Sequence, residues 1–329
     1  MIRYVIKRLL MMILVSLGVI LFVFIVSRAS GDPVAAILGE NYTQEQYDQI
    51  YYSMGFDRPQ IVQFFSYIVD VLHGDLGRSY HNNADIWGEI MFRFPDSIKI
   101  AVFTLLWAVP VGLIIGIISA VKQYSKLDYS LTTAAMILNS LPGFWVALML
   151  MLVFSLKLKL VSATGISSWK SYILPCVALG LHPMAHMARL SRSSMLEVIR
   201  QDYIRTARSK GLGEKKIIFK HALQNASMPL ITQVGSNFAT IVGSSAVVEN
   251  IFMIPGLGNF LSMSIANRDY PAIQGTVLVF SIFVGFVNLL VDICFGFVDP
   301  RIKAKYSNTA SLKSKIQTWK LAREAGVRS

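Results

Sequence analysis

Six intervals of this chain, of 18 to 28 residues each, contain no aspartate, glutamate, lysine or arginine. A helix needs about 20 mostly apolar residues to cross the hydrocarbon core of a bilayer. The intervals therefore predict an all-α, polytopic membrane protein with six transmembrane helices. We expect these helices at Leu9–Ser27, Ile100–Val121, Leu131–Leu156, Ile173–Ala188, Leu230–Val248 and Ala272–Phe297. The fourth is the weakest, because Pro175, His182 and Pro183 interrupt its apolar run.

The composition and the charge distribution point to a membrane and away from a soluble domain. Only 15% of the 329 residues are charged, against about a quarter in soluble domains. The net charge of +12 would also suit a nucleic-acid-binding protein, but the basic residues are unevenly placed. If the amino terminus is cytoplasmic, 22 of the 31 lysines and arginines lie in cytoplasmic segments, whereas residues 28–96 hold four bases and ten acids. This positive-inside bias predicts both termini in the cytoplasm and no nucleic-acid partner.

These boundaries divide the chain into four parts. Residues 1–28 form the first transmembrane helix, which we expect to be retained, with a cleaved signal peptide as the alternative. Residues 29–96 form an external loop subdomain, and residues 97–298 form a five-span core with a basic cytoplasmic segment at 191–228. Residues 299–329 form a basic cytoplasmic tail, which we expect to be partly disordered or to lie on anionic membrane lipid.

The external segments contain two predicted helices. Thr43 followed by Gln46 is a capping-box pattern at the start of the first. The second is amphipathic and has its apolar residues on one side, namely Ile61, Phe64, Phe65, Ile68, Val69 and Leu72. It either lies at the outer membrane surface or packs on the bundle, and the pattern is compatible with both. Glu249 and Arg268 are either partner contacts or solvated ends of the last external loop.

Small residues recur every four positions on two of the predicted spans. Gly112, Gly116 and Ala120 form one such face, and Gly235, Ala239 and Gly243 form the other. Such faces allow helix backbones to approach closely in lipid. Pro142 and Gly143 predict a kink in the third span. On the fifth span we expect the residues that line a translocation pathway, which are Ser236, Asn237, Thr240, Ser244 and Ser245.

The most charged internal stretch runs from Arg189 to Met228, with nine basic and three acidic residues. Its spacing predicts two short helices, Met195–Lys210 and Glu214–Leu223. The first places Leu196, Ile199, Tyr203, Ile204 and Ala207 on an apolar face. Gly211 and Gly213 mark the break, because glycine adopts the left-handed conformation that ends a helix. A charged pair of helices between two apolar spans must lie outside the bilayer, and we expect it to be a docking surface.

No residue pattern of a soluble enzyme stands out. The sequence has no Gly-x-x-x-x-Gly-Lys-Ser/Thr phosphate loop, no paired-cysteine metal pattern and no nucleophile elbow. We therefore expect a non-catalytic chain that binds no cofactor. His182 and His186 are four residues apart, but Pro183 lies between them and no carboxylate is close in sequence. We predict no metal site there, and expect packing or a neutral polar lining instead.

Seven ordered pieces of the chain resemble the membrane subunits of ATP-binding-cassette (ABC) importers, in their peptide and nickel branch. These pieces are Gly31–Val34, His73–Gly77, Ser193–Val198, Asp202–Leu212, His221–Ala226, Pro255–Gly258 and Arg268–Gln274. The resemblance implies a type I ABC importer fold in the bacterial inner membrane. It also implies a homologous second permease subunit, two ATPase subunits that use ATP and Mg, and an extracytoplasmic substrate-binding protein.

In that family a Glu-Ala-Ala-x-x-x-Gly motif forms the coupling helices, which sit in a groove of the ATPase subunits. Here Gly211 takes the glycine position and Arg205, Thr206 and Ala207 take the first three positions, so the usual glutamate is absent. The resemblance implies that the ATPase-coupling residues are Asp202, Tyr203, Arg205, Thr206, Ala207, Arg208, Lys210, Gly211 and Leu212.

The expected function is a permease subunit of an ATP-driven importer, which forms a pathway for di- or oligopeptides together with a homologous subunit. Import of nickel or of a metal chelate by the same kind of complex is the alternative. A secondary transporter or channel without an ATPase is the alternative of another class. It would be favoured by paired buried charges or inverted repeats, and neither is clear in the sequence. A membrane-embedded enzyme is a third alternative, weakened by the lack of clustered catalytic side chains.

Overall fold

The computed structural model describes residues 2–39 and 42–298, and the expected basic tail at 299–329 lies outside the described residues. The described chain is all-α: it has no strand, and one isolated β-bridge joins Arg78 and Asp85. Its elements are α1 (Ile2–Ala29), α2 (Pro33–Leu38), α3 (Gln44–Ser53), α4 (Gln60–Leu72), α5 (Ile86–Val121), α6 (Lys126–Ser140), α7 (Gly143–Leu150), η1 (Met151–Lys157), η2 (Trp169–Tyr172), α8 (Ile173–Ile199), α9 (Asp202–Ser209), α10 (Glu214–Lys216), η3 (Ile217–Ala222), α11 (Leu223–Ile251), α12 (Leu257–Ala266) and α13 (Tyr270–Val298). η1 and η3 are π-helical and η2 is a 3₁₀ turn.

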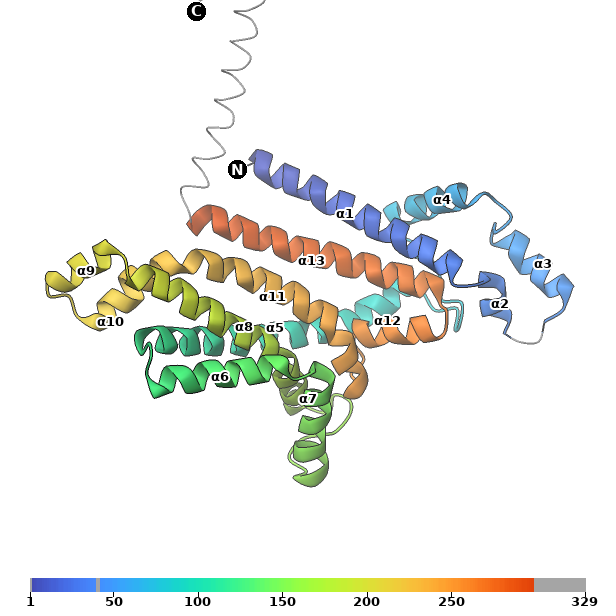
Figure 1. Ribbon diagram of the computed structural model, residues 1–329. Helices are drawn as coiled ribbons and strands as arrows, with labels where there is room; N and C mark the ends of the chain where they lie inside the picture. The colour runs from blue at the N-terminus through green and yellow to red at the C-terminus, as the bar shows by residue number, and fades with distance from the viewer. Residues whose placement is uncertain (1, 40–41, 299–329) are drawn as a thin grey trace, which may run out of the picture.

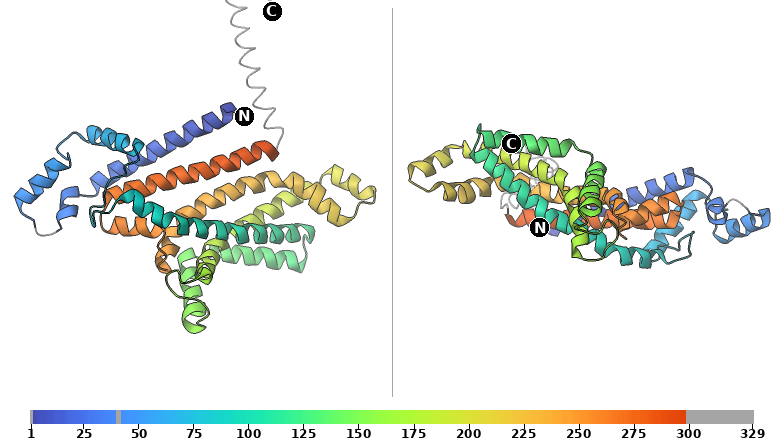
Figure 2. Two further views of the ribbon diagram at one scale, coloured as in Figure 1. Left: turned by 180° about the vertical axis from the view of Figure 1, so that it is seen from behind. Right: turned by 90° about the horizontal axis from the view of Figure 1, so that it is seen from below.

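The long helices lie side by side in one bundle (Figures 1 and 2). α9 and α10 project from one end, toward which α1 begins and α13 finishes (Figure 1). α2, α3 and α4 lie at the opposite end, together with α12 (Figure 1). The bundle thus separates the basic segment from α2, α3 and α4, which the sequence predicts on the other side of the membrane.

The helices differ in how well they meet the length and apolarity that a membrane span needs. Among the described residues, α1, α5 and α13 are long and apolar enough, and α6 with α7–η1 would make a fourth, broken span. α8 and α11 have 27 and 29 residues, ample for a crossing. Their prolines, histidines and hydroxyl side chains make them less apolar, so spans four and five stay predictions. Both are rich in buried residues, and interior helices of a bundle need less apolar surface.

The largest differences from the expected helix boundaries are at the start of α5 and the end of α8. α5 begins at Ile86 and not near Ile100, because the Asp85 carboxylate caps it and accepts a hydrogen bond from the Gly88 N–H (2.7 Å). α8 continues past the expected end at Ala188 to Ile199. The predicted helix Met195–Lys210 is therefore wrong: its first part is the end of α8 and its second part is α9.

The third predicted span is broken at the expected place but far more sharply than a kink. α6 and α7–η1 meet at an angle of 97°. Leu141 and Pro142 have extended backbone between them, with ψ of 132° and 129°. Proline disfavours helical conformation in the residue before it and lacks an N–H of its own. As a result α7 points away from the bundle axis (Figure 1).

α5 and α8 pack closely through the predicted small-residue face. A Cβ atom on Gly112 would lie 2.5 Å from the carbonyl oxygen of Met184, and one on Gly116 would lie 2.5 Å from that of Ala188. The indole N–H of Trp107 also donates to the Cys176 carbonyl (3.0 Å). The two backbones therefore touch where the glycines lie, which confirms that part of the prediction.

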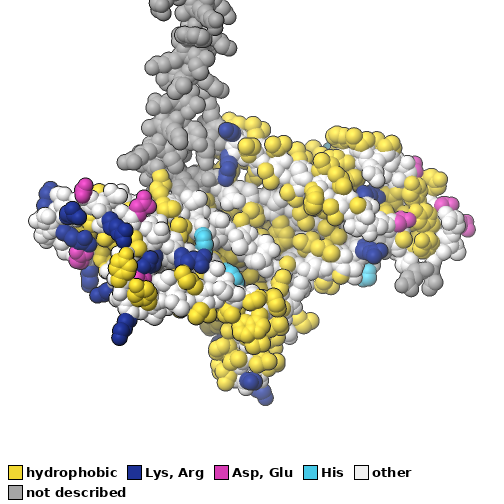
Figure 3. Space-filling model, in the orientation of Figure 1, with side chains coloured by type: hydrophobic (Ala, Val, Ile, Leu, Met, Phe, Trp, Pro, Cys, Tyr) yellow, Lys and Arg dark blue, Asp and Glu magenta, His cyan; other side chains and the backbone are white. Residues whose placement is uncertain are grey.

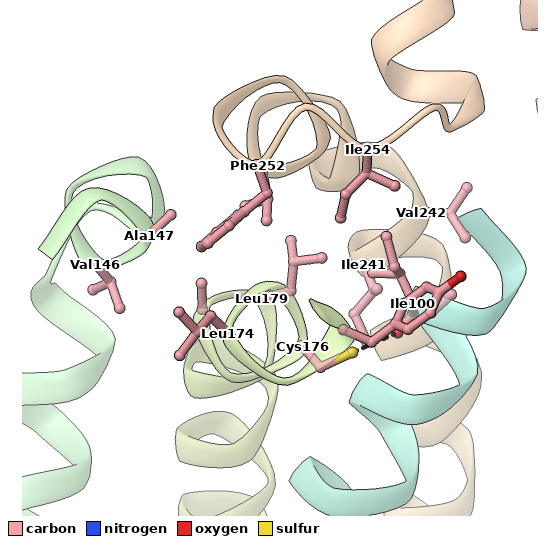
Figure 4. Packing of buried hydrophobic residues seen from close by; sticks show 14 of the residues in the cluster. Ile100, Val146, Ala147, Leu174, Cys176, Leu179, Ile241, Val242, Phe252 and Ile254 are labelled. Carbon is pink, nitrogen blue, oxygen red and sulfur yellow. Dashed lines mark hydrogen bonds between the residues drawn. The ribbon is translucent and has the colours of Figure 1, made fainter. Parts of the chain in front are cut away.

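Away from the α9–α10 end, one cluster of the core forms where α5, α7, α8 and α11 meet. Figure 4 shows side chains of α8 and α11 converging with Ile100 of α5. Phe252 and Ile254, which follow α11, close this cluster from one side (Figure 4). Val146 and Ala147 approach from α7 (Figure 4). This core holds α7 against α8 in spite of the sharp bend.

α3 confirms the predicted capping box, and α4 modifies the predicted apolar face. The Thr43 hydroxyl accepts from the Gln46 N–H, and the Gln46 side chain accepts from the Thr43 N–H. The phenol of Tyr47 donates to Asp32 (2.7 Å), which raises the pKa of Tyr47 to about 12. In α4 the packed residues are Phe64, Tyr67, Ile68 and Val71, whereas Ile61, Phe65, Val69 and Leu72 are exposed. α4 therefore both packs on the bundle and presents an apolar side outward.

Glu249 was expected at a loop end, and the structure contradicts both interpretations of it. Its side chain is 0% exposed, so it is neither solvated nor available to a partner. One carboxylate oxygen accepts from the Ser97 hydroxyl (2.8 Å) and the other from the Asn259 N–H (2.9 Å). Ser97 in turn accepts from the Leu257 N–H (2.8 Å). Glu249 and Ser97 thus cap α12, because the N-cap residue Gly256, which precedes the helix, has no side chain to do so.

Candidate coupling surface

The apolar side of the α9–η3 pair anchors it to the bundle. Ile204 and Ala207 of α9 and Ile217 and Ala222 of η3 are buried. They pack with Ile117, Ala120, Met195 and Ala226, which lie at the ends of α5, α8 and α11. Three long helices therefore end on the same short hairpin. The hairpin shares one close-packed core with the ends of all three helices.

Gly211 forms the turn between α9 and α10, as predicted. Its φ is +75°, in the left-handed region. The Gly211 N–H donates to the Arg208 carbonyl (2.9 Å), and the Leu212 N–H donates to the Ala207 carbonyl (3.4 Å). These two hydrogen bonds define a Schellman motif with glycine at its usual position. Gly213 does not share this role, because its φ is −64° and any residue can adopt it.

The opposite side of the hairpin is exposed and basic, and includes most of the predicted coupling residues. Of these residues, Ala207 is buried and Leu212 is half-buried. The exposed ones are Asp202, Tyr203, Arg205, Thr206, Arg208, Lys210 and Gly211. Arg208 bridges the turn by donating to Glu214 (2.7 Å). The lysine and arginine side chains gather at this end of the molecule (Figure 3).

Two exposed aromatic side chains add an apolar element to this surface. Tyr203 is 45% exposed and Phe219 is 61% exposed. The sequence pattern placed Tyr203 on the buried face, which is wrong, because α9 starts afresh at Asp202 and does not continue the phase of α8. No sequence pattern indicates a role for Phe219. Exposed aromatic residues beside arginines are the side chains that contribute most often to binding energy at protein interfaces.

An ion pair next to the hairpin fixes α6 against α8. Arg192 is one of the nine basic residues of the Arg189–Met228 stretch, and its guanidinium donates to both oxygens of Asp128, at 2.7 and 2.8 Å. The Asp128 side chain is 2% exposed. No pattern in the sequence indicates this pair, although Asp128 is an acid at the edge of a predicted span.

The predicted pathway residues of α11 do not share one face. Ser236, Thr240 and Ser244 are exposed along one side of the helix, whereas Asn237 and Ser245 are buried. The hydroxyls of Thr240 and Ser244 donate to the carbonyls of Ser236 and Thr240, at 3.0 and 2.8 Å. The exposed stripe is therefore small and weakly polar.

The two histidines of α8 stand apart from any cluster of metal ligands. His182 is half-buried and His186 is exposed, and α8 continues as a helix through Pro183. Within the described residues, no group of three or more histidine, cysteine, aspartate or glutamate side chains is arranged to hold a metal ion.

Comparison with known families decides what kind of protein carries this surface. Residues 112–304 match the binding-protein-dependent transport system inner membrane component, and residues 1–101 match the amino-terminal part of such membrane components. The chain belongs to this family of inner membrane components. The resemblance to ABC importer permeases is thereby confirmed.

Curated members of the family match over their whole length. The inner membrane component is 39% identical over 307 residues to the glutathione transport system permease protein GsiC of Salmonella choleraesuis, covering 93% of this chain and 100% of the relative. It is 35% identical over 338 residues to the dipeptide transport system permease protein DppB of Escherichia coli K12, with coverage of 93% and 100%.

A solved structure shows the same fold. The inward-facing MetNI methionine ABC transporter matches with a TM-score of 0.55 and 18% identity, over 64% of this chain and 96% of that chain. The inner membrane component thus has the type I ABC importer fold and is a multi-pass membrane protein. Its family implies ATPase and substrate-binding partners, and ATP acts through the former.

Proposed function

We propose that this chain is the permease subunit of an ATP-driven importer of di- or oligopeptides, and that α9, Gly211 and η3 couple it to the ATPases. The observation that carries the proposal is the two-sided hairpin: its apolar side is packed on three long helices and its basic and aromatic side is exposed. A chain without a phosphate loop needs a separate ATPase, and this hairpin offers the surface for one.

The coupling step follows from the packing. ATP binding closes the two ATPase subunits and pulls on the exposed side of α9. Because Ile204 is fully buried in the cluster that also holds the ends of α5, α8 and α11, the pull rotates these helices as a body. The pathway then opens outward. The Arg208–Glu214 pair keeps the two halves of the hairpin together during this movement.

The complex that we infer contains a homologous second permease subunit, two ATPases and an extracytoplasmic substrate-binding protein. A single bundle of this kind cannot enclose a central pathway, so a second subunit has to complete it. The external helices α2, α3, α4 and α12 form the docking face for the binding protein. Both termini and the hairpin lie in the cytoplasm in this arrangement, in agreement with the positive-inside bias.

Of the five predicted pathway residues, we retain Ser236, Thr240 and Ser244 as the pathway lining on this chain. Their exposed, weakly polar side of α11 suits a solvated peptide, which must bind weakly enough to leave again. Asn237 and Ser245 are buried, and in this proposal they pack the helix and do not meet the cargo.

The peptide assignment is supported by the names of the glutathione and dipeptide permeases, to which the chain is 35–39% identical. It is tested by deleting the chain from cells that carry the complete transporter. Uptake of radiolabelled dialanine should be lost, and re-expression of His182→Ala with His186→Ala should restore it. Loss of nickel uptake with unchanged dipeptide uptake would reject the peptide assignment.

A further inference from the structure

A basic groove lies between α6 and α8, beside the coupling hairpin. It has a volume of about 600 Å³ and is lined by Thr132, Met136, Arg189, Arg192, Ser193, Leu196, Glu197 and Arg200. The proposed import cycle assigns it no role. Its lining combines arginines and hydroxyls with apolar side chains, so it suits a ligand that has one anionic and one apolar part.

Two of the three arginines in the groove are available to a ligand. Arg192 is held by Asp128, and the same carboxylate accepts from the Thr132 hydroxyl (3.2 Å). Arg189 and Arg200 form no ion pair within the described part of the chain. Glu197 is the one acid among the lining residues, and it forms no ion pair within the described part of the chain. Guanidinium groups match the oxygens of a phosphate in geometry and charge.

The flank of the groove is apolar and uncovered. α6 packs mainly against α5 and α8, which leaves its other side free in this chain. On that side Tyr129, Met136 and Ile137 are all more than half exposed. Met136 also belongs to the groove itself, so the apolar flank and the basic lining are continuous. Tyrosine at the end of an apolar helix is typical of a membrane–water interface.

We propose that this groove binds an anionic phospholipid. Arg189 and Arg200 hold its phosphate, and the exposed Ser193 hydroxyl in the lining is a further donor. An acyl chain lies along α6 over Met136 and Ile137. A free phosphate would make no use of this apolar flank. A zwitterionic lipid would find Glu197 alone for its cationic group, so an anionic headgroup fits better.

The test counts lipids retained by the complete purified transporter in native mass spectrometry, with added phosphatidylglycerol or phosphatidylcholine. Arg189→Gln with Arg200→Gln removes two charges from the groove. Lys215→Gln with Lys216→Gln is the matched control, because it removes the same charge from exposed residues of α10 outside the groove. We expect phosphatidylglycerol to bind the groove variant about tenfold more weakly and the control about as tightly as the unaltered protein.

Three outcomes would overturn the proposal. The control could lose as much phosphatidylglycerol as the groove variant, which would indicate a diffuse basic surface. Phosphatidylcholine could be retained equally well by the unaltered protein, or millimolar inorganic phosphate could displace the lipid completely. If the double variant does not assemble, Arg200→Gln alone is measured, since Arg200 is exposed at the end of α8. About fivefold weaker binding is then expected, and unchanged binding would contradict the proposal.

Discussion

The guanidinium of Arg192 on α8 holds the carboxylate of Asp128 on α6 through two hydrogen bonds, of 2.7 and 2.8 Å. Asp128 also accepts from the Tyr124 N–H (3.0 Å) and from the Thr132 hydroxyl (3.2 Å). Four donors therefore surround one buried carboxylate, which offsets the cost of removing it from water. The pair fixes the end of α8, and α9 starts three residues after that helix ends.

Asp128→Asn should destabilise the protein strongly. It leaves Arg192 facing an amide that cannot accept all four donors, and breaking a buried pair costs about 3 kcal/mol. Arg208→Gln is the control, because it breaks an exposed pair worth about 0–1 kcal/mol. Thermal unfolding of both variants in detergent measures the difference. Equal shifts in the two unfolding midpoints would mean that the buried pair stabilises the protein no more than the exposed pair does.

Gly211→Ala should weaken assembly with the ATPases. Alanine at φ of +75° costs about 1–2 kcal/mol, and relief of that strain distorts the Schellman turn. Gly213→Ala is the control at ordinary φ, and Gly211→Asn should restore part of the loss, because asparagine tolerates this conformation. Co-purified ATPase per permease is the readout. If Gly211→Ala and Gly213→Ala behave alike, the turn does not set the coupling surface.

Gly112→Ala should destabilise the bundle, whereas Gly243→Ala should not. The added methyl group at 112 would meet backbone of α8 at 2.5 Å, but at 243 nothing lies within 4 Å. Overpacking of this kind costs about 1–3 kcal/mol. Thermal unfolding of the isolated chain in detergent compares the two variants. A Gly112→Ala protein as stable as the parent would show that α5 and α8 are not in close contact.

The orientation can be tested by cysteine labelling in a background without Cys176 and Cys294. A membrane-impermeant maleimide applied to spheroplasts should label Asp48→Cys in α3 but should label Ser209→Cys in α9 only after lysis. The reason is the concentration of basic residues at the α9 end. Labelling of Ser209→Cys in intact spheroplasts would invert the topology.

The sequence predicted those features that depend on local chemistry. Gly211 ends a helix because of its own backbone freedom, and the capping box at Thr43 needs only residues three apart. Gly112 and Gly116 mark a close helix contact because their spacing follows the helical period. The apolar intervals located the long helices because the length and composition of a span are also local properties of the chain.

The features that the sequence analysis missed depend on contacts between distant residues. Asp128 and Arg192 are 64 positions apart, and Ser97 and Glu249 are 152 apart. Neither pair has a spacing that periodicity can detect, so Glu249 was assigned to a loop end. No glycine or proline lies at the break between α8 and α9, so the sequence does not indicate that a helix ends there. Continuing the helical phase across Arg200 therefore placed Tyr203 on the wrong face.

The central claim is that this chain passes peptides only when ATPases act on the α9–η3 hairpin. It is tested most directly by reconstituting the complete transporter in proteoliposomes and measuring uptake of radiolabelled dialanine delivered by its binding protein. We predict accumulation with ATP, none with ADP or without the ATPases, and a several-fold loss with Gly211→Ala. Accumulation that proceeds without the ATPases, driven by an ion gradient, would contradict the account and identify a secondary transporter.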